Sequence, residues 1–207
     1  MCSFLLKLMG LILVPALLFS CATTSLVDTW RNPDKPMLKH HKLVLVYISK
    51  SDATRRLYED VLASELNRMG VTSVSGYTLL PEGKRVNRQI LAKGVEKSGA
   101  DAVITMQTVQ VEQRMNVQPG FEEIYPDYWY PGAFPRWDMY GYFDGYSYYE
   151  PAYVSTYEVA MIQVNFFDVQ SGKLLWAATI RTSDPGNTIS VSKKLASIVV
   201  HSLIKEG

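Results

Sequence analysis

The sequence is poor in the residues that metal binding and cross-linking require. It contains two cysteines, Cys2 and Cys21, and three histidines. His40 and His41 are adjacent and therefore lack the i, i+4 spacing with which one helix face holds a metal ion. His201 falls on the expected solvent side of the last helix. We therefore expect no metal site and no cofactor.

Charge of either sign is not in excess, and motifs of catalysis are missing. The chain has 21 basic and 20 acidic residues, a balance that does not favour nucleic acid as a partner. It has no G-x-S-x-G elbow and no glycine-rich phosphate loop. Ser73 and Ser75 have no nearby histidine. Glu122 and Glu123 are adjacent carboxylates, but acid–base catalysis needs a buried carboxyl group, and they lie in a Gly- and Pro-rich stretch. We predict that the protein is not an enzyme.

The N-terminus has the layout of a secretory signal peptide. Lys7 provides a positive charge, and the apolar run over residues 8–18 is too short for a spanning helix of about 20 residues. The run ends at Leu18-Phe19-Ser20-Cys21, which resembles the lipobox of bacterial lipoproteins. The resemblance implies that residues 1–20 are removed and that Cys21 is acylated. A plain signal peptide followed by a chance cysteine is the alternative.

The lipobox resemblance also implies a location. Ala22 follows the cysteine, where lipoproteins retained in the inner membrane often have aspartate, so we expect a lipid anchor in the outer membrane and a domain facing the periplasm. Buried acyl chains contribute about 0.8 kcal/mol per CH₂, and two or more chains anchor a protein stably. Cys2 would leave with the signal peptide, so the mature chain would have no second thiol for a disulfide.

The remaining sequence predicts one α/β domain over residues 43–207, preceded by a lipidated tether and lead-in over residues 21–42. Trp30, in the lead-in, is expected to pack on the edge of the domain. Residues 43–48, LVLVYI, form a continuous apolar run that is typical of a strand covered on both faces. A short strand is predicted over residues 71–74, and a third strand over residues 101–111.

Two helices are predicted between these strands. Ser51 and Asp52 can cap the first, and Gly70 can end it. Its apolar stripe is expected to contain Leu57, Val61, Leu62, Leu66 and Met69. Its water-facing side is expected to contain Arg55, Arg56, Glu59, Asp60 and Arg68. Asn87 opens the second helix and Gly99 closes it.

The second half of the domain predicts a hairpin and a last helix. Alternating apolar residues precede and follow the turn at residues 168–173, where Gly172 can supply the turn conformation. The last helix places Leu195 and Ile198 on its apolar face, and Val164 and Trp176 hold matching inward positions in the hairpin. The predicted fold is therefore α/β (α+β), a mixed sheet of about five strands with elements in the order β-α-β-α-β-β-β-α.

Two stretches carry a resemblance to known envelope proteins. They are LAKGVEKSGADAVITMQTV over residues 91–109 and FFDVQSGKLLWAAT over residues 166–179. They resemble periplasmic lipoproteins of the curli-secretion type, the N-terminal domain of the Tol-system propeller protein, and lipoprotein activators of penicillin-binding proteins. The chain is also similar to small bacterial lipoproteins with a Tyr/Gly-rich loop. The resemblance extends loosely over residues 43–205 and implies a fold and a compartment, without catalytic residues.

An aromatic segment over residues 119–153 joins the third strand to the hairpin and is expected to hang from one end of the sheet. Residues 121–153 hold 14 of the chain's aromatic residues. A loop of this length is usually functional or disordered, and disordered segments have few aromatic residues. Tyrosine and tryptophan offer large contact areas with few rotamers to fix. The candidate binding residues are Tyr128, Trp129, Tyr130, Trp137, Tyr140 and Tyr142.

Three functions are compatible with these features. The first is a non-enzymatic interaction or assembly module of the bacterial envelope, whose aromatic segment meets a protein partner or a second copy of the chain. The second is a peptidoglycan- or glycan-binding module that uses the same segment. The third is an envelope hydrolase. A purely structural lid over one end of the sheet is the alternative to any binding role for the rings.

Overall fold

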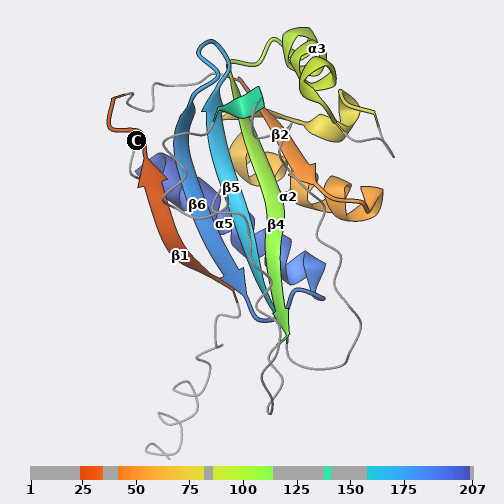
Figure 1. Ribbon diagram of the computed structural model, residues 1–207, viewed down its shortest axis with the longest axis vertical. Helices are drawn as coiled ribbons and strands as arrows, with labels where there is room; N and C mark the ends of the chain where they lie inside the picture. Colours follow the sequence, from red (N-terminus) through yellow and green to blue (C-terminus); the bar gives the residue numbers. More distant parts are fainter. Residues whose placement is uncertain (1–23, 35–41, 82–85, 114–137, 141–157, 206–207) are drawn as a thin grey trace, which may run out of the picture.

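The computed structural model describes residues 24–34, 42–81, 86–113, 138–140 and 158–205 (Figure 1). Its elements are β1 (Thr24–Arg31), β2 (Lys42–Ile48), α2 (Asp52–Arg68), β3 (Thr72–Ser75), the 3₁₀ turn η2 (Gly76–Thr78), α3 (Arg88–Ser98), β4 (Ala102–Gln113), β5 (Glu158–Asp168), β6 (Leu174–Thr182) and α5 (Thr188–Lys205). The six strands form one sheet in the order β1-β6-β5-β4-β2-β3. The predicted order of elements is confirmed from β2 to α5, and β1 adds a sixth strand.

β2 is parallel to both of its neighbours, whereas the remaining neighbouring strands are antiparallel to each other. β2 pairs in parallel with β3 and β4, and β4, β5, β6 and β1 then pair antiparallel. Figure 1 shows α5 behind the sheet and α3 at its upper end. α2 shares a buried cluster with α5, and α3 belongs to a second cluster. The connection from β2 to β3, which contains α2, therefore crosses one face of the sheet. The connection from β3 to β4, which contains α3, crosses the opposite face.

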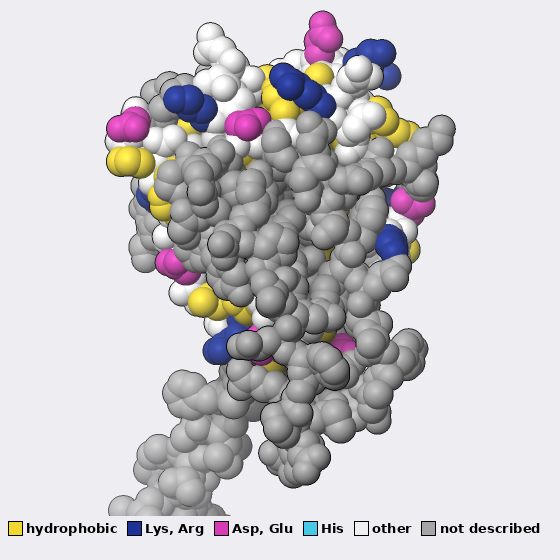
Figure 2. Space-filling view, viewed as in Figure 1, with side chains coloured by type: hydrophobic (Ala, Val, Ile, Leu, Met, Phe, Trp, Pro, Cys, Tyr) yellow, Lys and Arg dark blue, Asp and Glu magenta, His cyan; other side chains and the backbone are white. Residues whose placement is uncertain are grey.

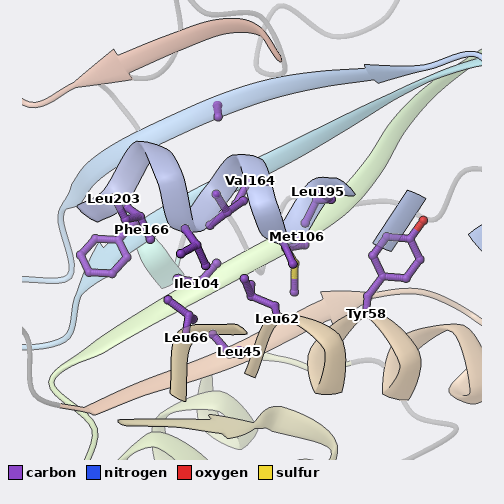
Figure 3. Close-up of a cluster of buried hydrophobic side chains, with 14 of the residues drawn as sticks. Leu45, Tyr58, Leu62, Leu66, Ile104, Met106, Val164, Phe166, Leu195 and Leu203 are labelled. Carbon is purple, nitrogen blue, oxygen red and sulfur yellow. The ribbon is translucent and has the colours of Figure 1, made fainter. Parts of the chain in front are cut away.

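The larger core lies between the sheet and helices α2 and α5 (Figure 3). Leu45, Ile104, Met106, Val164 and Phe166 of the sheet meet Tyr58, Leu62 and Leu66 of α2 and Leu195 and Leu203 of α5. Of the predicted core residues, Leu195, Val164 and Trp176 are fully buried, and Ile198 packs at the edge of the cluster. The inward positions of the hairpin and the last helix are thus confirmed. His201 is exposed, as predicted.

The opposite face of the sheet is apolar at one end and polar in its middle. Leu91 and Val95 of α3 cover Val103 and Phe167 at the apolar end. Two residues further along each strand, Thr105 and Asn165 are also fully buried, as is Gln163. The side-chain amides of Gln163 and Asn165 donate to Asn165 Oδ1 and Thr105 Oγ1, both at 3.2 Å, and Thr179 Oγ1 donates to Gln163 Oε1 at 3.0 Å. This buried polar row satisfies its own hydrogen bonds across three strands.

β1 corrects the expectation that residues before position 42 form only a lead-in. Thr24–Arg31 pairs antiparallel with β6, and the register shifts between Leu26 and Asp28. Arg31 Nη2 donates to the carbonyl oxygen of Ser202 at 2.9 Å, which ties the strand to α5. Trp30 packs against the cluster under α3, so its predicted edge position is confirmed. Leu26 and Val27 are exposed, and β1 therefore lacks the alternation by which strands are recognised.

The hairpin and the helix ends follow the predicted local chemistry. Gly172 has φ 68° in the β5–β6 turn, and Gly99 has φ 64° at the end of α3, a region that other residues rarely adopt. Ser51 Oγ accepts from the Thr54 N–H at 3.2 Å, and Asn87 Oδ1 accepts from the Ile90 N–H at 2.9 Å. The predicted caps of α2 and α3 are thus confirmed.

We predict that Leu195→Ala lowers the free energy of unfolding by about 2–5 kcal/mol. Leu195 is fully buried between α5 and the sheet, and truncation would leave a cavity. Ile189→Ala, an exposed position on the same helix, is the control and should change stability by less than about 0.5 kcal/mol. Chemical denaturation of both variants measures the difference, and equal midpoints would place α5 outside the core.

Candidate functional site

A cavity of about 470 Å³ lies at the carboxyl ends of the parallel strands β2 and β4. Tyr47 to Ser51 line it from β2 and the start of α2, and Thr108 and Val111 line it from β4. Pro185, Gly186 and Thr188 close it from the start of α5. β3 and β4 flank β2 on opposite sides, so the winding of the chain reverses at β2. Open α/β sheets usually bind ligands at such a reversal, beyond the carboxyl ends of the strands.

A β-bulge in β4 directs side chains into this cavity. The register between β4 and β5 shifts between Thr108 and Gln110, so Thr108 pairs with Ile162 and Val111 pairs with Ala160. In a regular strand, Val111 would fall on the opposite face from Thr108, because the two are three residues apart and side chains alternate along a strand. The bulge therefore places Val111 of β4 on the cavity side, where Ala160 and Ile162 of β5 also lie.

Two stacked tyrosine rings line the inner part of the site. The rings of Tyr47 and Tyr58 lie 4.2 Å apart at an interplanar angle of 21°, and the Tyr47 hydroxyl shares a hydrogen bond of 3.0 Å with Thr108 Oγ1. Burial raises the pKa of Tyr47, and burial followed by the proximity of Tyr47 raises the pKa of Tyr58. Both phenols are therefore neutral at physiological pH, and the pair offers apolar ring surface rather than a phenolate base.

The two helix starts at the cavity are occupied by their own caps. Ser51 Oγ accepts from the Thr54 N–H, and Asn187 Oδ1 accepts from the Ser190 N–H at 3.2 Å. Lys50 and Glu158, of opposite charge, are the charged residues among those that line the cavity in the described part of the chain. The site is thus close to neutral and largely apolar, and it suits an uncharged ligand better than an anion.

Most sequence-predicted site residues lie outside the described residues. These are Cys21, Tyr128, Trp129, Tyr130, Trp137 and Tyr142. Tyr140 is described and is partly buried, with the guanidinium carbon of Arg88 4.6 Å from the centroid of its ring. It is not near the cavity, because it packs on the cluster under α3.

The residues around Tyr140 attach the middle of the aromatic segment to the sheet. The Met139 N–H donates to the carbonyl oxygen of Gly172 at 2.8 Å, and Asp138 forms a β-bridge with Lys173. Met139 is fully buried against Val103 and Phe167. This attachment lies at the β5–β6 turn, whereas the segment leaves β4 and enters β5 at the other end of the sheet. The expectation that the segment hangs from one end is therefore wrong for its middle residues.

A second feature that the sequence did not predict is a buried ion pair in α2. Arg55 and Glu59 were expected to face water, but they are 5% and 0% exposed. Arg55 Nε donates to Glu59 Oε1 at 3.0 Å. The same carboxylate accepts from the Tyr47 N–H at 2.9 Å and from the Tyr77 N–H at 2.7 Å. Glu59 therefore joins α2 to β2 and to the turn after β3.

This carboxylate has a structural explanation rather than a catalytic one. Burial raises the pKa of Glu59 to about 6, against the opposing effects of Arg55 and the two backbone N–H groups. Both oxygens are occupied by protein donors, and Glu59 does not line the cavity. Gly76 lies beside it, since a Cβ there would come within 3.5 Å of Glu59 Oε1, and within 2.6 Å of the Leu45 carbonyl oxygen. The close approach of this turn to β2 explains the glycine.

We predict that Glu59 makes stability depend on pH between about 4.5 and 6. Its folded pKa of about 6 exceeds its usual 4.5, so the folded state binds the proton more tightly. This contribution is complete below pH 4.5 and is lost as the pH rises through 6, a decrease of about 2 kcal/mol. Relative to Glu59→Gln, which cannot titrate, the wild type should lose stability over this window in denaturation curves.

The control for removing one negative charge is Glu65→Gln, since Glu65 lies on the same helix in an exposed ion pair with Arg68. The free energy of unfolding of Glu65→Gln should depend on pH in the same way as that of the wild type. Parallel curves for the wild type and Glu59→Gln between pH 4 and 7 would contradict the assignment.

The described residues contain no group of three or more His, Cys, Asp or Glu side chains that could hold a metal ion. Within the same ranges, no helix has the length and apolar character needed to cross a membrane.

Comparison with known families gives one match. Residues 83–205 match the family described as a domain of unknown function, DUF4136. The match spans more than half of the chain and extends from just before α3 to the end of α5. Among curated proteins, none matches the sequence significantly.

Solved structures of two bacterial proteins resemble the chain. The PelC dodecamer from Paraburkholderia phytofirmans has 12% sequence identity and a TM-score of 0.44, and the similarity covers 87% of this chain and 96% of that chain. Lipoprotein GNA1162 from Neisseria meningitidis has 13% identity and a TM-score of 0.37, with 79% and 98% covered. At these identities the similarity concerns the fold alone. The resemblance to the curli-secretion type stays a prediction.

Proposed function

We propose that this chain, which belongs to the DUF4136 family of domains of unknown function, is a lipid-anchored interaction module of the bacterial cell envelope. Cys21 carries the anchor, the domain faces the periplasm from the outer membrane, and the aromatic segment over residues 119–153 meets a protein partner or a second copy of the chain. The module acts by contact and carries out no reaction.

The attachment at Met139 is the observation that carries this proposal. A segment that served only as a loose linker would gain nothing from a fully buried side chain at its centre. Met139 is fully buried, its N–H donates to Gly172, and the neighbouring Tyr140 contacts Arg88. The sheet thus fixes Met139 and Tyr140, and Tyr140 is one of the candidate binding residues. Rigid aromatic anchors on a fixed scaffold are the usual basis of a recognition surface.

The charge distribution supports a contact role that does not depend on nucleic acid. Removing residues 1–20 removes one basic residue, Lys7, and leaves 20 basic and 20 acidic residues. On the face shown in Figure 2, side chains of both signs are interspersed among the described residues. Neither the net charge nor this face shows the concentration of positive charge that nucleic-acid binding requires.

We predict that Cys21→Ser abolishes incorporation of labelled palmitate and moves the protein from the membrane pellet to the soluble fraction. The serine hydroxyl cannot replace the thiol that receives the lipid, and an unanchored domain has no acyl chain to hold it. The matched control is Ser20→Ala, which changes the adjacent residue and leaves the thiol. Labelled lipid in the Cys21→Ser protein would contradict the lipoprotein assignment.

We predict that replacing Trp129 and Trp137 with alanine lowers capture of the partner from solubilised envelopes and leaves the melting temperature unchanged. Each such anchor can contribute about 2 kcal/mol or more to an interface. Ile189→Ala, which truncates an exposed apolar residue outside the segment, is the control. Pull-down from envelopes and a thermal melt are measured on the same preparations.

The two readouts separate binding from a structural lid. If the double variant melts at a lower temperature and captures as much partner as the wild type, the rings only cover the sheet. Cosedimentation of the protein with purified peptidoglycan, lost in the double variant, would favour the glycan-binding alternative over a protein partner.

A further inference from the structure

The cavity lies beside the residue at which the sheet begins. Thr24 is the first residue of β1 and is buried, and its hydroxyl donates to Thr182 Oγ1 at 3.0 Å. Thr182 is itself one of the residues that line the cavity. Figure 1 shows β1 starting and β6 ending at the same end of the sheet. The chain therefore enters the domain at the wall of the cavity.

The predicted lipidation site is close to this point by covalent geometry alone. Cys21 precedes Thr24 by three residues, and three extended residues span at most about 11 Å. An acyl chain on the thiol or the amine of Cys21 thus starts within reach of the cavity, whatever path the three residues take.

We propose that the cavity holds one of the fatty acyl chains attached to Cys21. The inference rests on the proposed lipid anchor and adds a place for one chain when the protein is away from a bilayer. The remaining chain or chains stay available for insertion, and a membrane competes with the cavity for the bound one.

The lining of the cavity matches this ligand. The stacked rings of Tyr47 and Tyr58 and the side chains of Val111, Ala160 and Ile162 give apolar contact for methylene groups. Serine and threonine hydroxyls also line it, which suits the carbonyl group by which the chain is joined to Cys21. An ester or amide carries no charge, and the cavity offers no excess of charge to a free carboxylate.

The size of the cavity also fits a single small apolar ligand. Its volume of about 470 Å³ lies within the usual range of ligand sites, roughly 300–1,000 Å³. Both helices that could have covered this end of the core, α2 and α5, begin at its edge instead. The sheet therefore continues past them, through Val111 and Ala160, into a space that the described helices leave open.

The first test compares two forms of the mature chain. One is acylated protein purified from membranes and freed of detergent, and the other is the chain from residue 21 with Cys21→Ser, made without the preceding residues. The probe is the methyl ester of cis-parinaric acid, which is uncharged like the acyl groups on Cys21 and fluoresces in apolar surroundings. We expect the serine form to bind the probe, and the acylated form to bind it at least about tenfold more weakly, because its own chain occupies the site.

The second test places the bound chain in this cavity. In the serine form, Ala160→Phe should weaken probe binding at least about tenfold, because the ring excludes roughly two or more methylene groups of the probe from the cavity. Met161→Phe is the matched control, since the next residue of β5 points to the other face of the sheet. Thr188→Phe, at a half-exposed lining position, repeats the test at a site where a larger side chain perturbs the core less.

Three results would overturn the proposal: no binding of the probe by the serine form, equal binding by the two forms, or binding that neither Ala160→Phe nor Thr188→Phe weakens. Mass spectrometry of the mature N-terminus separates this failure from failure of the anchor. An unmodified Cys21 contradicts the proposed lipidation. If the acylated protein binds the probe as well as the serine form does, only the proposed position of the acyl chain is contradicted.

Discussion

The parallel pairing of β2 with both β3 and β4 is the constraint on which the rest of the structure depends. A strand that is apolar on both faces must be covered on both faces, and Leu43 to Ile48 are all buried. α2 and α5 cover one side and α3 the other. Because the chain leaves β2 toward β3 and returns on its other side as β4, the carboxyl end of β2 opens between the two connections. The cavity there follows from topology and needs no unusual residue.

The buried pair of Arg55 and Glu59 fixes this arrangement locally. Glu59 accepts from backbone groups of Tyr47 and Tyr77, so one carboxylate joins the central strand, the first helix and the turn that follows the edge strand. Such a pair contributes little net stability when compared with apolar residues, but removing one partner leaves a buried charge, at a cost of about 3–5 kcal/mol. Arg55 Nη2 is buried and has no hydrogen-bond partner in the described part of the chain, which lowers the net contribution of the pair to stability. The pair therefore specifies geometry more than it adds stability.

The order of elements could be predicted from periodicity and turn chemistry, because those signals are local. β1 could not, since its exposed Leu26 and Val27 hide the alternation and its partner lies far along the chain. The helical pattern assigned Arg55 and Glu59 to water because the backbone groups that satisfy Glu59 come from outside the helix. The cavity is built from ordinary residues between Tyr47 and Thr188, and the bulge that turns Val111 inward leaves no mark in the sequence. Composition alone identified the aromatic segment, whereas its attachment depends on one methionine among many rings.

The attachment at Met139 divides a single long connection into two shorter ones, over residues 114–137 and 141–157, each with both ends held by the sheet. The entropy of closing a loop grows slowly with length, by about 0.6 kcal/mol for each doubling. Insertions and deletions in either part therefore cost little free energy of folding, provided that the residues at the attachment are kept. The fold thus separates the residues on which the stability of the α/β domain depends from two connecting stretches whose length can change.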